Sequence, residues 1–272
     1  MNKDIKIAIA FYGITRSLKY TIDSIYKNII NPTKEIANVK IFCHFFSQTS
    51  IENPRTNESI ITDPNEWKLL NPDIYIIDEV DVAKEKIIYE NLIKFGNAWE
   101  DDGQSLKNII RQLISLQIIS NKIEENDNFD YIIFARPDMI YHDSFSDIIK
   151  KQINKQNKIC IPYWAWSGGL NDRFAICGKK AYKIYGNRID QALNYCISKN
   201  KPFHSERLLM FAIQKSTSQL NTMPHRATRV RGNGFYAKEV FKKVKLAKII
   251  QAFFLCNVIP MLNNFFRVKK LK

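Results

Sequence analysis

The sequence predicts an α/β protein, in which a sheet of buried strands is flanked by helices. Short apolar runs at 5–12, 131–135 and 158–162 have the length and composition of such strands. After the first run, Leu18, Ile22, Ile25 and Ile29 follow at helical spacing and predict a helix packed on the sheet and ending at Asn31-Pro32. A strand, a turn at Gly13 and a helix are typical of the start of a nucleotide-binding half.

Length and composition limit the possible classes of protein. The chain has 272 residues, of which 45% are hydrophobic, enough for one large domain or one domain with an appendage. Residues 1–6 run directly into the first strand without a signal-peptide pattern, so we expect a cytoplasmic protein. The five cysteines are scattered and lack metal-binding spacing, which predicts buried free thiols.

The strand at 131–135 leads into the most informative motif of the chain. It delivers Arg136 and Asp138 on either side of Pro137, which disfavours helix at the residue before it. Open α/β sheets bind ligands at such strand ends. One interpretation is a structural ion pair. The other is a phosphate and metal site, in which Asp138 holds a hard cation such as Mg or Mn and Arg136 contacts phosphate.

A loop rich in aromatic residues and glycine follows the strand at 158–162. Trp164 and Trp166 could stack on sugar rings, Gly169 would let a ligand approach the backbone, and Asn171 could accept hydroxyl hydrogen bonds. These residues are candidates for binding a glycan substrate. The alternative is a loop with buried aromatic side chains and a turn at Asn171-Asp172.

Two of these stretches resemble a known family. The strand–Arg-x-Asp–strand motif at 131–141 and the segment Gly168-Gly169 to Phe174 are similar to GT-A-type bacterial glycosyltransferases of the lipopolysaccharide and capsule kind. Arg-x-Asp stands where many of these enzymes have Asp-x-Asp, so metal binding is less secure than nucleotide-sugar binding. The resemblance covers about residues 5–211. It implies a GT-A-like, Rossmann-type nucleotide-binding sheet and sugar transfer from a nucleotide diphosphate to a hydroxyl of a surface glycan or glycolipid.

The resemblance also implies roles at the donor site. The first loop would hold the nucleotide, which makes Tyr12, Gly13 and Arg16 candidates, and the helix start there offers free amides to an anion. The alternatives are a core aromatic at Tyr12 and a solvated side chain at Arg16. Farther along, Arg229 and Arg231 could close over the diphosphate as a flexible basic loop, or belong to an ordinary basic strand or loop at the surface.

The resemblance further suggests a catalytic base. An acid at a helix start facing the acceptor serves as the base in inverting members, so Glu206 is our candidate, with Asp172 as the second. If the enzyme retains configuration, no such base is needed. The plain alternative for Glu206 is a first-turn acid that interacts with the helix dipole.

The basic charge of the chain is concentrated near its C-terminal end. Residues 238–272 carry nine Lys/Arg and one Glu, a net +8 of the total +14, around an apolar run at 249–262. We therefore divide the chain into a GT-A-like domain at 1–237 and a basic amphipathic helical tail at 238–272. The tail predicts peripheral association with an anionic membrane, here the inner face of the plasma membrane. A helix packed on the domain, or an arm that docks on a protein, is the alternative.

Two other classes of function make different predictions about the charge and activity of the chain. A basic nucleic-acid-binding protein would spread its charge along a groove with interleaved aromatics, so we expect no nucleic acid. A non-catalytic, membrane-associated scaffold of the same fold is also compatible with the sequence.

Overall fold

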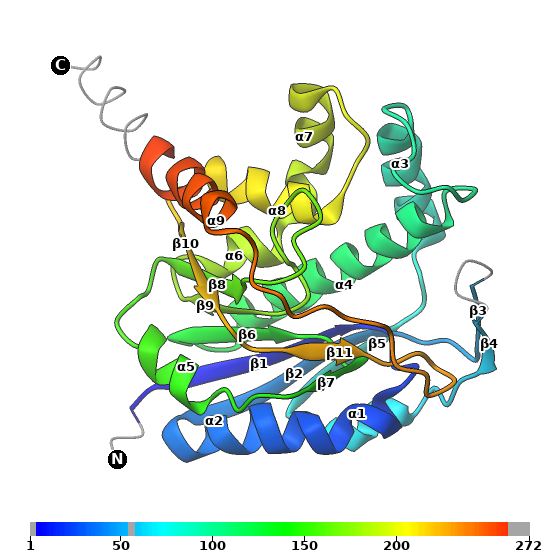
Figure 1. The fold of residues 1–272 in the computed structure, drawn as a ribbon. Helices are drawn as coiled ribbons and strands as arrows, with labels where there is room; N and C mark the ends of the chain where they lie inside the picture. The colour runs from blue at the N-terminus through cyan, green and yellow to red at the C-terminus, as the bar shows by residue number, and fades with distance from the viewer. Residues whose placement is uncertain (1–3, 54–57, 261–272) are drawn as a thin grey trace.

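A computed structural model describes residues 4–53 and 58–260, and a seven-stranded mixed sheet forms the centre of this part (Figure 1). Its strand order is β10-β8-β9-β6-β1-β2-β5, and all neighbours are parallel except β9, which is antiparallel to β6 and β8. The predicted α/β class, with a Rossmann-type sheet flanked by helices, is confirmed. The bounds are β1 (Lys6–Gly13), β2 (Asn38–Phe46), β5 (Ile74–Asp78), β6 (Tyr131–Ala135), β8 (Lys158–Pro162), β9 (Ala175–Gly178) and β10 (Gln219–Met223).

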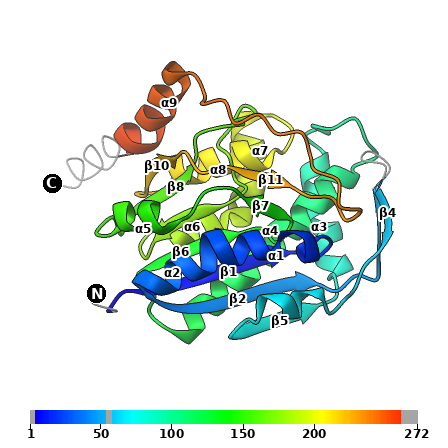
Figure 2. The same cartoon turned by 60° about the horizontal axis from the view of Figure 1, so that its bottom comes forward.

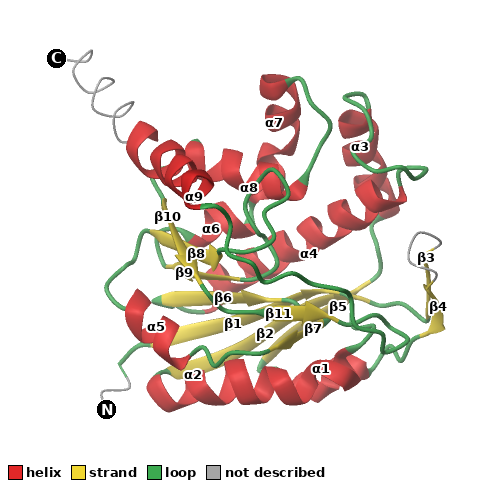
Figure 3. Ribbon diagram, viewed as in Figure 1, coloured by secondary structure: helices red, strands yellow, loops and turns green. Residues whose placement is uncertain are grey.

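Helices cover both faces of the sheet, as the views in Figures 2 and 3 show. Alternation along β1 explains this, because Ile7, Ile9 and Phe11 lie in the core beneath α1, α2 and α5, while Ala8, Ala10 and Tyr12 belong to the core beneath α4, α6 and α8. Both sets are buried, which accounts for the continuous apolar run. The bounds are α1 (Leu18–Ile25), α2 (Asn31–Ile36), α3 (Val82–Ile93), α4 (Gln104–Asn126), α5 (Ser146–Gln152), α6 (Tyr182–Gly186), α7 (Ala192–Lys199), α8 (Ser205–Gln214) and α9 (Leu246–Phe253).

Two small antiparallel pairs lie outside the main sheet. β7 (Met139–Tyr141) pairs with β11 (Ala227–Arg229), and β3 (Ser50–Asn53) pairs with β4 (Glu58–Ile61). The strands β3 and β4 are only four residues each, too short for their pattern to stand out from the polar residues around them.

The first helix continues past the proline at which we expected it to end. A π-helical turn, Tyr26–Ile30, connects α1 to α2, and Pro32 lies in the first turn of α2. Proline has no N–H to donate to the carbonyl four residues earlier. That carbonyl, on Asn28, accepts a hydrogen bond from the Phe145 amide at 2.8 Å instead, so the helix continues without an unpaired group at this position.

The described part of the tail packs on the domain. Ala252 and Cys256 are buried in the core, and the Asn257 side chain bonds both the N–H and the C=O of Leu220 (2.7 and 3.2 Å), at the outer edge of β10. The helix thereby covers part of an exposed sheet edge. Residues 261–272, which complete the predicted basic tail, lie outside the described residues. Within the described residues, no helix has the length and apolar character needed to cross a membrane.

Candidate functional site at the strand switch point

A cleft of about 490 Å³ opens where the strand order of the sheet reverses. From β1 the chain proceeds outward to β2 and β5, and it then returns to the other side of β1 to form β6. Ligands of open α/β sheets bind at the carboxyl ends of strands at this kind of switch point. The volume is within the usual range for small-molecule sites. Nine of the predicted site residues line the cleft: Tyr12, Gly13, Arg16, Arg136, Asp138, Asp172, Glu206, Arg229 and Arg231.

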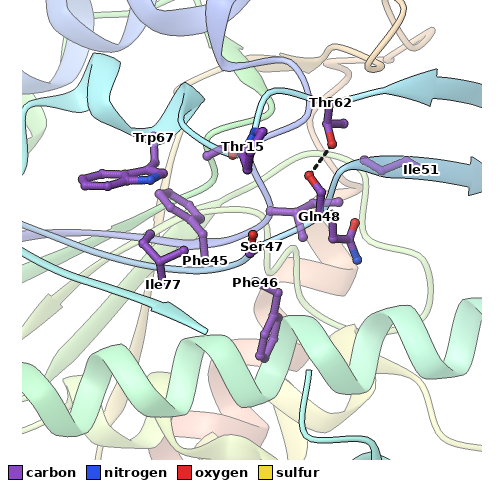
Figure 4. Close-up of a pocket in the computed structure, with 11 residues that line it drawn as sticks. Thr15, Phe45, Phe46, Ser47, Gln48, Ile51, Thr62, Trp67 and Ile77 are labelled. Atoms are coloured by element: carbon purple, nitrogen blue, oxygen red, sulfur yellow. Dashed lines mark hydrogen bonds between the residues drawn. The ribbon is translucent and has the colours of Figure 1, made fainter. Parts of the chain in front are cut away.

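A second, much smaller cavity lies beside the cleft (Figure 4). It is bounded by aromatic side chains such as Phe45 and Trp67, and on another side by Thr62, whose hydroxyl donates to the carbonyl of Gln48. Its volume is about 10 Å³, which is room for roughly one water molecule. The cleft is therefore the candidate for binding a substrate.

Two arginines donate hydrogen bonds to the carboxylate of Asp138. Arg136 donates from Nε to Oδ1 at 2.8 Å and from Nη2 to Oδ2 at 2.7 Å, a bidentate pair. Arg16 donates from Nη2 to Oδ2 at 2.9 Å. The Arg136 backbone is held by the hydroxyl of Tyr141, which accepts from its N–H and donates to its C=O. The β6–β7 connection thus holds Arg136 and Asp138 in a fixed arrangement.

The other two predicted arginines, Arg229 and Arg231, lie at the end of β11 and just beyond it. Arg229 ends β11, and the next residue, Val230, donates its N–H to the carbonyl of Asp138 at 2.8 Å. Of the two interpretations of this segment, a flexible basic loop and a basic surface strand or loop, the structure shows a strand, because pairing with β7 fixes its backbone beside the Arg136–Asp138 motif. Glu58 on β4 adds an anion between Arg16 and Arg231, at 3.5 and 3.7 Å.

The charges of these groups depend on one another. Burial alone would raise the pKa of Asp138, but Arg136 and Arg16 hold the pKa well below its usual range, so this carboxylate stays ionised. Burial, together with repulsion from Arg136, lowers the pKa of Arg229 to about 10. The nearest acid to Arg229 in the described residues is Glu239, at 4.0 Å. Arg229 is therefore a cation that an added anion would stabilise.

On the α8 side of the cleft, Glu206 is a protonatable acid. Its Oε2 accepts the N–H of Ser167 at 2.5 Å. Burial, followed by repulsion from Asp172, raises its pKa to about 8. Asp172 itself is held by the buried Arg188, whose Nη2 donates at 3.2 Å. Glu206 can thus release or accept a proton near neutral pH, whereas Asp172 is engaged in an ion pair.

The four residues predicted to bind glycan make other contacts. Trp164 is fully buried, and its indole N–H donates to the His225 carbonyl at 2.7 Å, so it has no face to offer a sugar. The indole N–H of Trp166 donates to the Pro162 carbonyl, and the Asn171 amide donates to the Trp164 carbonyl. Gly169 is not among the residues that line the cleft.

Gly169 instead allows two backbone segments to approach. A Cβ placed on it would lie 2.2 Å from the carbonyl carbon of Glu206, and the next amide, of Leu170, donates to the Glu206 carbonyl at 3.0 Å. The loop rich in aromatics therefore positions the start of α8, and the alternative of buried aromatics with a turn describes it better than a sugar platform.

The side chains near Asp138 do not suit a resident divalent cation. Both oxygens of Asp138 already accept hydrogen bonds from guanidinium groups. In the residues that the structure describes, no three His, Cys, Asp or Glu side chains cluster in a way that could hold a metal ion. A hard cation needs several oxygen ligands, and here arginines stand where those ligands would be.

Several residues outside the two motifs also belong to the site. Gln112 accepts from Arg136 Nη1 at 2.7 Å, and Arg173 lines the cleft. Ser115 on α4 accepts the Gly13 N–H at 2.8 Å and also bonds His44, which holds the first loop against the sheet. Ser115 interrupts the apolar stripe of α4, and that polar interruption was the available signal.

Comparisons with known proteins give a distant structural likeness. Neither a protein-family model nor a curated protein sequence matches the chain. Among solved structures, GlyE, a glycosyltransferase of Streptococcus pneumoniae TIGR4, is 9% identical over 80% of this chain with a TM-score of 0.41, and the chain spans 45% of it. An active-site mutant of LgtC is 11% identical over 80% of this chain and 72% of its own, with a TM-score of 0.43. Mouse xyloside xylosyltransferase 1 is 8% identical, with a TM-score of 0.38; the match covers 76% of this chain and 81% of the mouse protein's chain.

Proposed function

We propose that the protein transfers a sugar from a nucleotide diphosphate donor to a hydroxyl of a surface glycan such as lipopolysaccharide or capsule. The observation that carries this proposal is the content of one cleft: four arginines at the carboxyl ends of β1, β6 and β11, and a carboxyl group with a pKa of about 8 at the start of α8. The first group suits a leaving diphosphate and the second suits an attacking hydroxyl.

The arginines would act by electrostatic stabilisation. As the bond from the sugar to the diphosphate breaks, negative charge grows on the leaving phosphate oxygens. Arg136 and Arg16 are fixed in position before that moment, since both are bonded to Asp138. Charges that are already oriented need no reorganisation during the reaction, which is the main source of their effect.

Glu206 would take the proton of the acceptor hydroxyl in a reaction that inverts configuration. A general base is most effective when its pKa lies near the working pH. Burial and the nearby Asp172 raise the pKa of Glu206 into that range. Arg188 bonds Asp172 and so keeps this second carboxylate in place.

The acceptor side of the proposal includes an anionic membrane, consistent with a cytoplasmic protein held at the inner face of the plasma membrane. On α9 and the turn that follows, Leu246, Ile250, Phe254 and Val258 are 64%, 59%, 51% and 40% exposed and recur every four residues. The exposed Lys245 and Lys248 lie on the same segment. An apolar stripe with basic residues fits the surface of an anionic bilayer, where a lipid-linked acceptor would be found.

The donor is tested by thermal unfolding with UDP, GDP, CMP and dTDP. A ligand that binds the native state must raise its unfolding temperature. Stabilisation by UDP, GDP or dTDP, followed by transfer or hydrolysis of the matching nucleotide sugar, would support the proposal, whereas stabilisation by CMP alone would indicate a donor without a diphosphate. No stabilisation by any of them would contradict it and favour a scaffold or nucleic-acid-binding role.

The membrane part has a separate test. Binding to anionic vesicles should exceed binding to neutral ones and should weaken in the Ile250→Ser, Phe254→Ser double variant. Because both side chains are exposed, the thermal stability should not change. Equal binding of the variant and the unaltered protein would rule out this surface as the anchor.

A further inference from the structure

We infer that the arginine cluster, rather than a divalent cation, neutralises the donor diphosphate. The cluster consists of five arginines that line the cleft and the three acids paired with them: Arg16, Arg136, Arg173, Arg229 and Arg231, with Asp138, Glu58 and Glu239. This inference rests on the proposed function, because it specifies how the same cleft would hold its donor.

Asp138 holds the arginines of the cluster in place. Its side chain is only 5% exposed, and its two oxygens receive three guanidinium hydrogen bonds between 2.7 and 2.9 Å. A metal ion would have to displace these donors and then lie next to two cations. A buried charge that loses its partners is strongly unfavourable, so the ligand set opposes a metal at this position.

The charges of the cluster balance those of a diphosphate. Its five arginines and the three acids paired with them sum to +2, with Arg136 and Asp138 at the centre. The diphosphate of a nucleotide sugar is a diester that carries two negative charges. The net positive charge of the cluster therefore equals the negative charge of the diphosphate. An added divalent cation would leave an excess of positive charge in the cleft.

Two arginines of the cleft have hydrogen-bond donors that the protein does not use. Arg16 and Arg173 both line the cleft, and each has one buried guanidinium nitrogen, Nε and Nη1 respectively, without a hydrogen-bond partner in the described structure. Buried donors are normally paired. Phosphate oxygens are acceptors that suit planar guanidinium groups, so an anionic ligand could accept the hydrogen bonds of these two unpaired nitrogens.

Binding of pyrophosphate and of UDP, GDP, CMP and dTDP, measured by calorimetry with excess EDTA and then with Mn²⁺, tests the inference. The affinity for pyrophosphate and for the preferred nucleotide should be the same within about twofold in both conditions. Arg229→Gln should weaken it by about 10- to 100-fold, the usual loss for a charge-assisted hydrogen bond. Arg226→Gln is the matched control, because Arg226 pairs with Asp143 outside the cleft and should have no effect.

Asp138→Asn separates the two models most sharply. If Asp138 holds a metal, this variant should lose binding. If Asp138 organises arginines, asparagine still accepts a guanidinium hydrogen bond and the cluster gains a positive charge, so binding should persist or become tighter. Arg229→Gln provides an independent answer should Asp138→Asn fail to fold.

Two results would overturn the inference in different ways. Binding that EDTA abolishes and Mn²⁺ restores would replace the arginine cluster with a metal site and leave the nucleotide-sugar transferase intact. Absence of binding by every probe in both conditions would overturn the inference and the proposed function together.

Discussion

Replacing Glu206 with glutamine tests the chemistry and the electrostatics of the site at once. Glutamine keeps the shape of the side chain and an oxygen that can accept the Ser167 N–H. It removes the group that titrates. Transfer should fall by roughly 10²- to 10⁴-fold, the usual contribution of a general base. The rise of kcat/KM with pH through about 8, which the proposed function predicts for the unaltered protein, should disappear.

The stability of the protein should also respond, with a defined sign. The pKa of Glu206 is raised from 4.5 to about 8, so the folded state holds the proton more tightly than the unfolded chain does. Stability conferred by the neutral form is complete below pH 4.5 and is lost as pH rises to about 8. A shift of this size is worth up to ~5 kcal/mol at ~1.4 kcal/mol per unit. Because the side chain is partly exposed to solvent, we expect about 2 kcal/mol.

The assay compares the unfolding temperatures of Glu206→Gln and of the unaltered protein near the two ends of the pH range over which the stability changes. They should be similar at about pH 5, and the variant should unfold about 4 to 8 °C higher at about pH 9. Glu90→Gln, an exposed position on α3, serves as the control and should show neither effect. A variant with full transfer activity, or a stability difference that does not change with pH, would refute the reasoning.

Three further substitutions test the support around the cleft. Arg188→Met should destabilise the fold by about 3 to 5 kcal/mol in urea unfolding, because it leaves Asp172 buried without its cation, and a loss below about 1 kcal/mol would contradict the pairing. Ser115→Ala should cost about 1 to 3 kcal/mol and weaken nucleotide binding, since the Gly13 N–H loses its acceptor; unchanged affinity would show that this loop does not depend on the serine. Gly169→Ala should lower the transfer rate more than the donor affinity, because the new Cβ would collide with the first turn of α8, and equal kinetics would contradict that contact.

The fold class could be predicted from the sequence because it depends on local patterns. The run at 131–135 is apolar on both sides and β6 is buried on both faces, so composition alone indicates a central strand. The same logic located the Arg136–Asp138 motif at a strand end. The β3–β4 pair could not be predicted in this way, because its strands are four residues long and carry few apolar residues.

The partners of the site residues could not be predicted in this way. Arg16 meets Asp138 across 122 positions of sequence, and Glu58 reaches Gly232 across 174. The Trp164 indole could equally have formed a sugar platform or a buried hydrogen bond, and only packing against the rest of the chain decides which. The spacing of apolar residues shows which face of a helix or strand is buried, but it does not show which residues that face contacts.

The amino-acid sequence by itself determined the α/β class, the strand that ends in Arg136 and Asp138, and a basic, apolar segment near the C-terminal end, because each depends on neighbouring residues. The tertiary structure decided that two arginines bond one carboxylate while two more line the same cleft, that the half-buried Glu206 lies near Asp172 with a raised pKa, and that α9 packs against the domain. Charge, burial and hydrogen bonding act through space, and the folded chain sets those distances.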